Sequence, residues 1–166
     1  MSSYRMLART ITVLLPGILA APGALHAQYQ QQVQTQMTQY SQPFLNSGYS
    51  SVTTLVTGSL SASSNTSHAV SLNGGRRYAI VGVCDNDCHD VDLRLFAPDG
   101  NSVASDVALD DHPTLNFTAP VSGEYRLQVD MVTCSHNPCY YRVQVFGGGS
   151  GGMNQPMPMN QSTPMN

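Results

Sequence analysis

The stretch Arg76–Phe96, RRYAIVGVCDNDCHDVDLRLF, holds two strand-like runs that flank a short loop with two cysteines and several aspartates. Residues 78–84 and 91–96 are rich in the apolar and β-branched side chains that favour strands. In the second run Val91, Leu93 and Leu95 alternate with Asp92, Arg94 and Phe96. The stretch therefore predicts two strands, and the second has one apolar face and one face that carries charge.

The chain on either side of this stretch also has runs of apolar and β-branched residues. Further strands are predicted at 52–60, 68–72, 102–107 and 114–118. A Ser/Thr/Asn-rich loop at 61–67 separates the first two. Alternating apolar residues at 124–131 and 141–145 predict an antiparallel hairpin with one buried face. Short strands with turn signals between them predict an all-β fold, an antiparallel two-sheet β-sandwich that is jelly-roll-like.

The two ends of the chain differ in composition from this predicted domain, 50–146. Residues 1–27 combine two arginines, an apolar run and a small-residue site before Gln28, which predicts a signal peptide. In the Gln-rich arm 28–49, apolar residues recur three or four apart, so the arm is either a short amphipathic helix or a disordered spacer; these residues are Tyr29, Val33, Met37, Tyr40 and Phe44. Residues 147–166, rich in Gly, Met, Asn and Pro, are predicted to be a disordered tail.

Composition excludes several classes of function. The chain has seven arginines and no lysine, which rules out Schiff-base chemistry and a P-loop lysine. After residue 27, ten acidic residues accompany five arginines, which gives a net charge of −5. An acidic chain of this kind binds nucleic acid poorly. We therefore expect no nucleic-acid partner, and no membrane span once the signal peptide is removed, because its apolar run is shorter than the roughly 20 residues that a span needs.

Four cysteines lie in two close pairs, Cys84 with Cys88 and Cys134 with Cys139. Export would place them in an oxidising compartment, where disulfides form. Three pairings are open, and we favour Cys84–Cys88 and Cys134–Cys139 because each closes a tight turn between strands. The alternative is a zinc site that adds His89 and His136 to the cysteines, although neither cysteine spacing is the two-residue spacing typical of zinc ribbons.

Four carboxylates crowd around the first cysteine pair, at Asp85, Asp87, Asp90 and Asp92. Their repulsion is relieved if the loop is solvated or if a hard cation lies among the oxygens. The spacing lacks the Gly and Glu that complete an EF-hand loop. Two interpretations stay open: a calcium site, or a loop in which Asp92 hydrogen-bonds backbone while the other carboxylates face water. No other cofactor is expected.

Between His68 and Phe146 the chain contains an ordered set of turn and strand residues: Gly75 and Tyr78, Asp90-x-Asp92-Leu93, Pro98-Asp99-Gly100, Asp106, Pro113, and Gly123-x-Tyr125. This order resembles the bacterial pre-peptidase C-terminal domain. The resemblance implies a secreted β-sandwich that is appended to exoenzymes and serves in targeting, substrate binding or secretion, with calcium or collagen bound by some members. It implies a non-catalytic role. The paired cysteine loops depart from the family's pattern.

Three functions are compatible with these observations. The first is an exported, non-catalytic β-sandwich module for binding, targeting or structural support in the periplasm or outside the cell, with a protein or glycan surface as partner. The second is a calcium-binding version of the same module. The third is a small secreted hydrolase built on His89 or His136, with Asp85 or Asp87 as the orienting carboxylate. We predict the first, in which the chain is not an enzyme and His89 and His136 are candidate binding residues.

Overall fold

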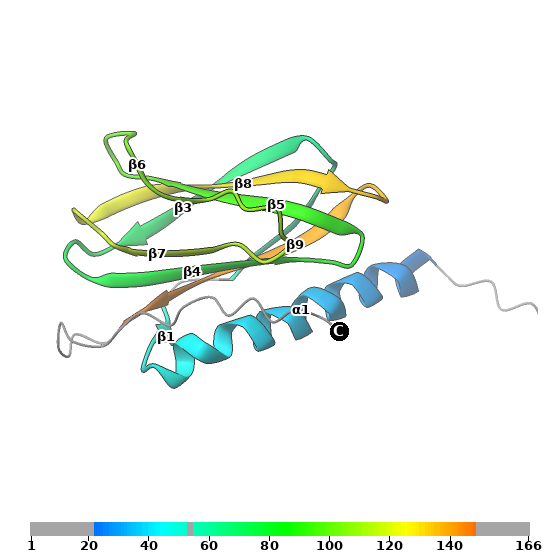
Figure 1. The fold of residues 1–166 in the computed structure, drawn as a ribbon, viewed down its shortest axis with the longest axis horizontal. Coiled ribbons are helices and arrows are strands. Elements are labelled where there is room, and N and C mark those ends of the chain that lie inside the picture. Colours follow the sequence, from blue (N-terminus) through cyan, green and yellow to red (C-terminus); the bar gives the residue numbers. More distant parts are fainter. Residues whose placement is uncertain (1–21, 53–54, 149–166) are drawn as a thin grey trace, which may run out of the picture.

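The computed structural model describes residues 22–52 and 55–148, which form a helix followed by strands in two layers (Figure 1). The elements are α1 (Pro22–Asn46), β1 (Ser50–Ser51), β2 (Val56–Leu60), β3 (Ser64–Leu72), β4 (Arg77–Cys84), β5 (Cys88–Phe96), β6 (Ser102–Asp106), β7 (Thr114–Thr118), β8 (Gly123–Cys134) and β9 (Cys139–Gly147). The predicted all-β fold class is confirmed. Most of the predicted signal peptide and nearly all of the predicted tail lie outside the described residues.

The strands form two antiparallel sheets that enclose one core. The first has the order β1-β9-β4-β7, with β2 also paired to β9, and the second has the order β3-β8-β5-β6. Alternate residues of each long strand point into the space between the sheets, where Ile80, Leu93, Leu127 and Val143 are almost fully buried. This burial of one face of each sheet against the other is what the period-two pattern of the sequence specifies.

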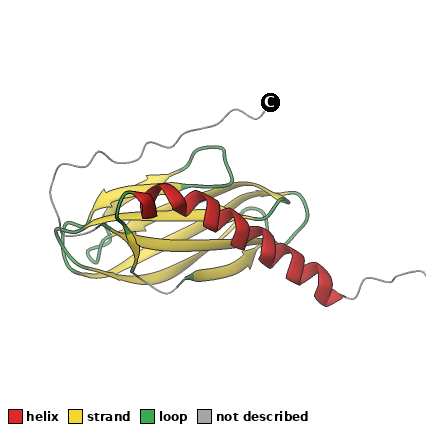
Figure 2. Cartoon of the chain, turned by 90° about the horizontal axis from the view of Figure 1, so that it is seen from below, coloured by secondary structure: helices red, strands yellow, loops and turns green. Residues whose placement is uncertain are grey.

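Helix α1 covers the outer face of the first sheet (Figures 1 and 2). Its residues Val33, Met37 and Phe44 are buried against Phe146 of β9 and against β4, whose outward residues are Ala79, Val81 and Val83. Because β4 is apolar on both faces, it needs cover on the side away from the core. The Gln-rich arm is therefore a docked helix rather than a disordered spacer. No helix in the described part of the chain has the length and apolar character to span a membrane.

The prediction that 124–131 and 141–145 form an antiparallel hairpin is wrong. Strand β8 pairs with β3 and β5, whereas β9 pairs with β1, β2 and β4, so residues 135–138 carry the chain from one sheet to the other. Residues 85–87 make the same crossing between β4 and β5. Alternation indicates which side chains are buried, but both sheets of a sandwich bury the same kind of face, so it does not identify the neighbouring strand.

Several predicted boundaries also shift. Strand β3 begins at Ser64, so only the first part of the predicted loop 61–67 is a turn, and β2 begins at Val56 rather than at residue 52. His68 therefore lies in the middle of β3 and not at the start of a strand. Strand β5 begins at Cys88 rather than at residue 91, so His89 lies within it. Strand β9 continues to Gly147, one residue beyond the predicted domain end.

Candidate functional site

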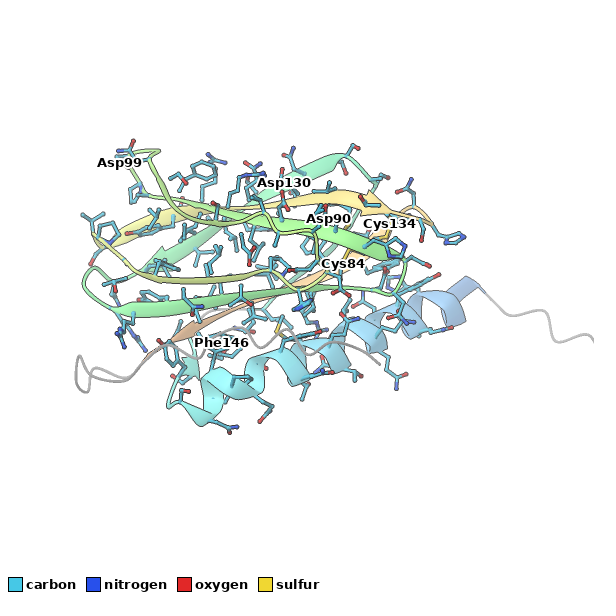
Figure 3. All side chains as sticks on the ribbon, viewed as in Figure 1. Cys84, Asp90, Asp99, Asp130, Cys134 and Phe146 are labelled. Carbon is cyan, nitrogen blue, oxygen red and sulfur yellow. A yellow bond between two sulfur atoms is a disulfide. The ribbon has the colours of Figure 1, made fainter. Side chains whose placement is uncertain are left out.

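Both disulfides brace a crossing between the two sheets, and both crossings lie at the same end of the molecule. Cys84–Cys88 closes the β4–β5 crossing and Cys134–Cys139 closes the β8–β9 crossing, with Cα separations of 5.8 and 5.9 Å. Cys88 and Cys134 are direct register partners in the second sheet. Figure 3 places Cys84 and Cys134 near each other and far from Asp99. The two local pairings are confirmed, and the oxidised cysteines cannot serve as thiolate ligands of zinc.

Hydrogen bonds join the two crossings into one surface. Ser135 donates to the backbone carbonyl of Asp87 from its amide nitrogen at 2.8 Å and from Oγ at 2.9 Å. The Tyr140 amide donates to Asp85 Oδ2 at 2.8 Å, and the Asp85 amide donates to the Tyr140 carbonyl at 3.0 Å. We call this surface, residues 84–88 and 134–140 with the helix residues that contact them, the cystine end.

The N-terminal half of α1 completes the cystine end. Tyr29 stacks on Tyr140 with ring centroids 5.4 Å apart, and the Asn86 amide donates to Gln32 Oε1 at 3.2 Å. A hydrogen bond to Asp87 and the charge of that carboxylate raise the pKa of the Tyr29 phenol. A shallow groove of about 410 Å³ runs along this contact and is lined by Gln28, Gln31, Gln32, Thr35, Gln36 and Asn86. Sequence reasoning missed this contribution, although Tyr29 belongs to the apolar stripe that predicted the helix.

Three of the four aspartates around the first disulfide have separate partners. Asp85 is fully buried, and burial raises its pKa while the amides of Tyr140 and Asp87 favour the ionised form. Asp87 contacts His136, with Nδ1 to Oδ1 at 3.3 Å. Asp92 pairs with Arg94 at 3.0 Å, and burial raises the pKa of Asp92 while Arg94 opposes the rise. Asp92 thus contacts an arginine side chain on the outer face of the second sheet.

Asp90 differs from the other three because its buried Oδ1 has no hydrogen-bond partner. Burial raises the pKa of Asp90, and the nearby negative charge of Asp110 adds to the rise. Among the described residues, no three His, Cys, Asp or Glu side chains are grouped so that they could hold a metal ion. The calcium site stays a prediction.

The two candidate binding histidines lie in different surroundings. The His136 side chain is 79% exposed and contacts Asp87 in the cystine end. His89 is an exposed residue of β5, and it lies close enough to Asp111 for its charge to act on that carboxyl. His136 therefore belongs to the cystine end, whereas His89 lies on β5 and acts electrostatically on Asp111 of the loop between β6 and β7.

A second polar cluster, absent from the sequence-based prediction, attaches α1 to that loop. His112 Nδ1 lies 2.8 Å from Asp111 Oδ1, and the His112 ring stacks on Tyr40 with centroids 4.4 Å apart. The hydrogen bond to Asp111 raises the pKa of His112, and the same bond lowers the pKa of Asp111. No sequence signal links Tyr40 to His112, because contacts between residues so far apart follow from how the helix docks on the sheet.

Residues 56–130 match the family model of the bacterial pre-peptidase C-terminal domain. The resemblance inferred from the sequence is confirmed over this range. The match to the pre-peptidase C-terminal domain begins at β2 and includes the first disulfide. It ends before Cys134, so helix α1, the second disulfide and β9 lie outside it. The cystine end is thus built only partly from matched residues.

The solved structures that are similar to the chain include two from bacterial proteins. One is the pre-peptidase C-terminal domain of collagenase from Bacillus anthracis, with 20% identity, 55% of this chain and 87% of that chain covered, and a TM-score of 0.46. The other is PliG from Aeromonas hydrophila, a periplasmic inhibitor of g-type lysozyme. It has 13% identity and a TM-score of 0.41, and the match covers 55% of this chain and 84% of that chain. No curated protein matches the chain.

Proposed function

We propose that this chain is an exported, non-catalytic binding module whose cystine end contacts a protein or glycan surface outside the cytoplasm. The observation that carries the proposal is the joining of two disulfide-braced crossings by the Ser135–Asp87 and Tyr140–Asp85 hydrogen bonds. A surface that is rigid before binding loses little conformational entropy when a partner docks. Its exposed side chains, including those of Asn86 and His136, offer amide and imidazole hydrogen-bonding atoms.

The contacts of the histidines support a non-catalytic role. His68 Nε2 lies 3.0 Å from the Tyr141 hydroxyl, His112 pairs with Asp111, and His136 contacts Asp87. Within residues 22–52 and 55–148, the hydrogen bonds described for the ring nitrogens of these histidines go to tyrosine or aspartate and not to a Ser, Thr or Cys side chain. A small hydrolase would need a nucleophile and a base within hydrogen-bonding reach. The family match, to a domain named for its place after a peptidase, agrees with an accessory role.

The two disulfides support an extracytoplasmic location, because such bonds persist in oxidising compartments and are rare in the cytosol. The predicted signal peptide gives the route. Non-reducing peptide mapping by mass spectrometry of protein secreted from the intact gene tests both points, and we expect the mature chain to begin at Gln28. An N-terminus at Met1 and four free thiols would contradict export.

Binding by the cystine end is tested with the oxidised protein and two immobilised probes, purified cell-wall glycan and surface-exposed protein from the same cells. The variant Asn86→Ala/His136→Ala changes two exposed residues of the cystine end. The control Glu124→Gln lies at the start of β8, at the opposite end of the strand that finishes at Cys134. We expect the double variant to lose about tenfold or more in affinity for one probe, and the control to lose none. Equal binding by the wild type, the double variant and the control would contradict the proposal.

A further inference from the structure

The outer edge of β3 is a long strand edge without the features that usually prevent pairing. In the described part of the chain, β3 pairs with β8 on one side and ends the second sheet on the other. Its nine residues, SNTSHAVSL, include no Asp, Glu, Lys, Arg or Pro. Its pairing with β8 runs through nine positions without a register shift. Exposed edges are normally protected by charge, proline, bulges or short length, and β3 has none of these.

The other sheet edges are better protected. Strands β6 and β7 have five residues each, β6 ends in Asp106, and the β5–β6 pairing has a register shift between Leu95 and Phe96. The opposite edge of the first sheet is divided between β1, with two residues, and β2, with five. Strand β3 is therefore the edge best suited to accept another strand.

We propose that β3 pairs antiparallel with β3 of a second copy of this chain, so that the two four-stranded sheets join into one sheet of eight strands. This contact is separate from the cystine end and does not depend on the function proposed for it. Two copies of an acidic chain repel each other, and a contact made by residues without formal charge adds no further repulsion. The β3 edge has only such residues along its whole length, and pairing of nine residues would form about eight main-chain hydrogen bonds.

The alternation of side chains restricts the register of this contact. Ser67 and Ala69 face outward and are exposed, whereas Val70 and Leu72 are buried in the core. Outward residues must pair with outward residues across the contact, because a one-residue slip would turn buried side chains toward solvent. A two-fold axis at His68 satisfies this and pairs all nine residues, with Ser67 opposite Ala69 of the second copy.

The space beside β3 can receive the inward side chains of an added strand. A cavity of about 660 Å³ lies between the β1–β2 region and the end of β3, lined by Ser51, Val52, Leu55, Val56, Ala69, Val70 and Ser71. In the register with its axis at His68, Thr66 of the second copy lies opposite Val70, at the cavity. Its methyl group would contact the valines, so the added strand would gain side-chain packing as well as main-chain hydrogen bonds.

Sedimentation velocity of the oxidised full chain over a concentration series tests the pairing. We expect the mass to rise from that of one chain to that of two chains with increasing concentration. In Ser67→Lys/Ala69→Lys the two chains would place lysines opposite each other, and we expect at least a tenfold weaker dimer. The matched control Asn116→Lys adds a charge to an exposed position of the β7 edge, and we expect it to dimerise like the wild type. A monomer at every concentration, or a dimer insensitive to the paired lysines, would overturn the proposal.

Cysteine cross-linking tests the register independently and does not require the lysine variants to fold. Chains with Ser67→Cys are mixed with chains with Ala69→Cys and oxidised. Because these positions are directly opposite in the proposed register, we expect a covalent dimer from the mixture in higher yield than from either variant alone. Equal yields from the mixture and the single variants would show that β3 is not paired in this way.

Discussion

Ser135 donates two hydrogen bonds to the backbone carbonyl of Asp87, one from its amide nitrogen at 2.8 Å and one from Oγ at 2.9 Å. The two residues are 48 positions apart in the chain. Ser135→Ala keeps the amide bond and removes the hydroxyl bond, so we expect the free energy of unfolding to fall by about 0.5–1.5 kcal/mol. Urea denaturation measures the change. Ser105→Ala, at an exposed position of β6, is the control, and an equal loss in both variants would contradict a specific role for Ser135.

Each disulfide should contribute modestly to stability, because each closes a short loop. The sequence separations are 4 and 5 residues, for which the loss of chain entropy in the unfolded state corresponds to about 2 kcal/mol per bond. We expect Cys84→Ala/Cys88→Ala and Cys134→Ala/Cys139→Ala each to fold and to lose about that amount in urea denaturation. If either variant is unfolded without denaturant, the disulfide that it lacks is needed for the sandwich to fold.

The sequence predicted what each strand buries but not which strands are neighbours. Tyr125, Leu127 and Val129 alternate with polar residues, and all three are buried as expected. The same alternation in β9 suggested a hairpin, yet the Ser135–Pro138 segment crosses between the sheets. A hairpin and a crossing both need a short polar turn between alternating runs, so local sequence does not distinguish them.

The candidate site was predicted only in part, again because local sequence does not identify neighbouring strands. The disulfide pairs were predictable because the cysteines are close in sequence. The grouping of both pairs at one end could not be predicted, because Cys88 and Cys134 become neighbours only through the pairing of β5 with β8. The aspartates were grouped by sequence spacing, but Asp85, in the crossing, and Asp92, in a strand of the second sheet, have different partners.

The docking of α1 should contribute strongly to stability. Phe44 is buried against Phe146 and Tyr49, so Phe44→Ala should lower the free energy of unfolding by about 3–5 kcal/mol. Leu45, the next residue, is 41% exposed, and Leu45→Ala should cost less than about 0.5 kcal/mol. Guanidinium denaturation of both variants measures the difference. Similar values for the two would mean that the helix is not packed on the sheet in solution.

The His112–Asp111 contact should make stability depend on pH in a defined direction. The bond to Asp111 raises the pKa of His112 above its usual value, so protonated His112 stabilises the folded state. That contribution is complete below the unfolded pKa of about 6.5 and is lost as pH rises through the higher folded value. The stability difference between wild type and His112→Gln should therefore be larger at about pH 5 than at about pH 9.

The stability difference between wild type and His112→Gln isolates the effect of His112 from that of other titrating groups. His68, for example, has a pKa lowered by burial, so its contribution is lost as pH falls, but it is present in both proteins and cancels. Thermal unfolding at a series of pH values gives the comparison. A difference that stays constant from about pH 5 to about pH 9 would exclude an interaction that depends on the charge of His112.

Asp90 should destabilise the folded protein at neutral pH. Its pKa is raised by burial and by Asp110, and its Oδ1 has no hydrogen-bond partner. A carboxyl with a raised folded pKa opposes folding when it is ionised, and this penalty disappears as pH falls through the folded value toward the unfolded value. Asp90→Asn removes the charge and keeps the shape, so we expect a gain of up to about 1 kcal/mol at pH 7 that shrinks on acidification.

The same variant tests the calcium hypothesis. A cation that binds only the folded state raises the melting temperature. Since the carboxylates near Asp90 do not group around one point, we expect calorimetry in excess calcium and in chelator to give the same melting temperature for wild type and Asp90→Asn. The control Asp99→Asn lies at the opposite end of the molecule from the cystine end (Figure 3). If calcium raises the melting temperature of wild type and of Asp99→Asn but not of Asp90→Asn, the unpartnered oxygen of Asp90 is a calcium ligand and the side chains around it rearrange to bind the ion.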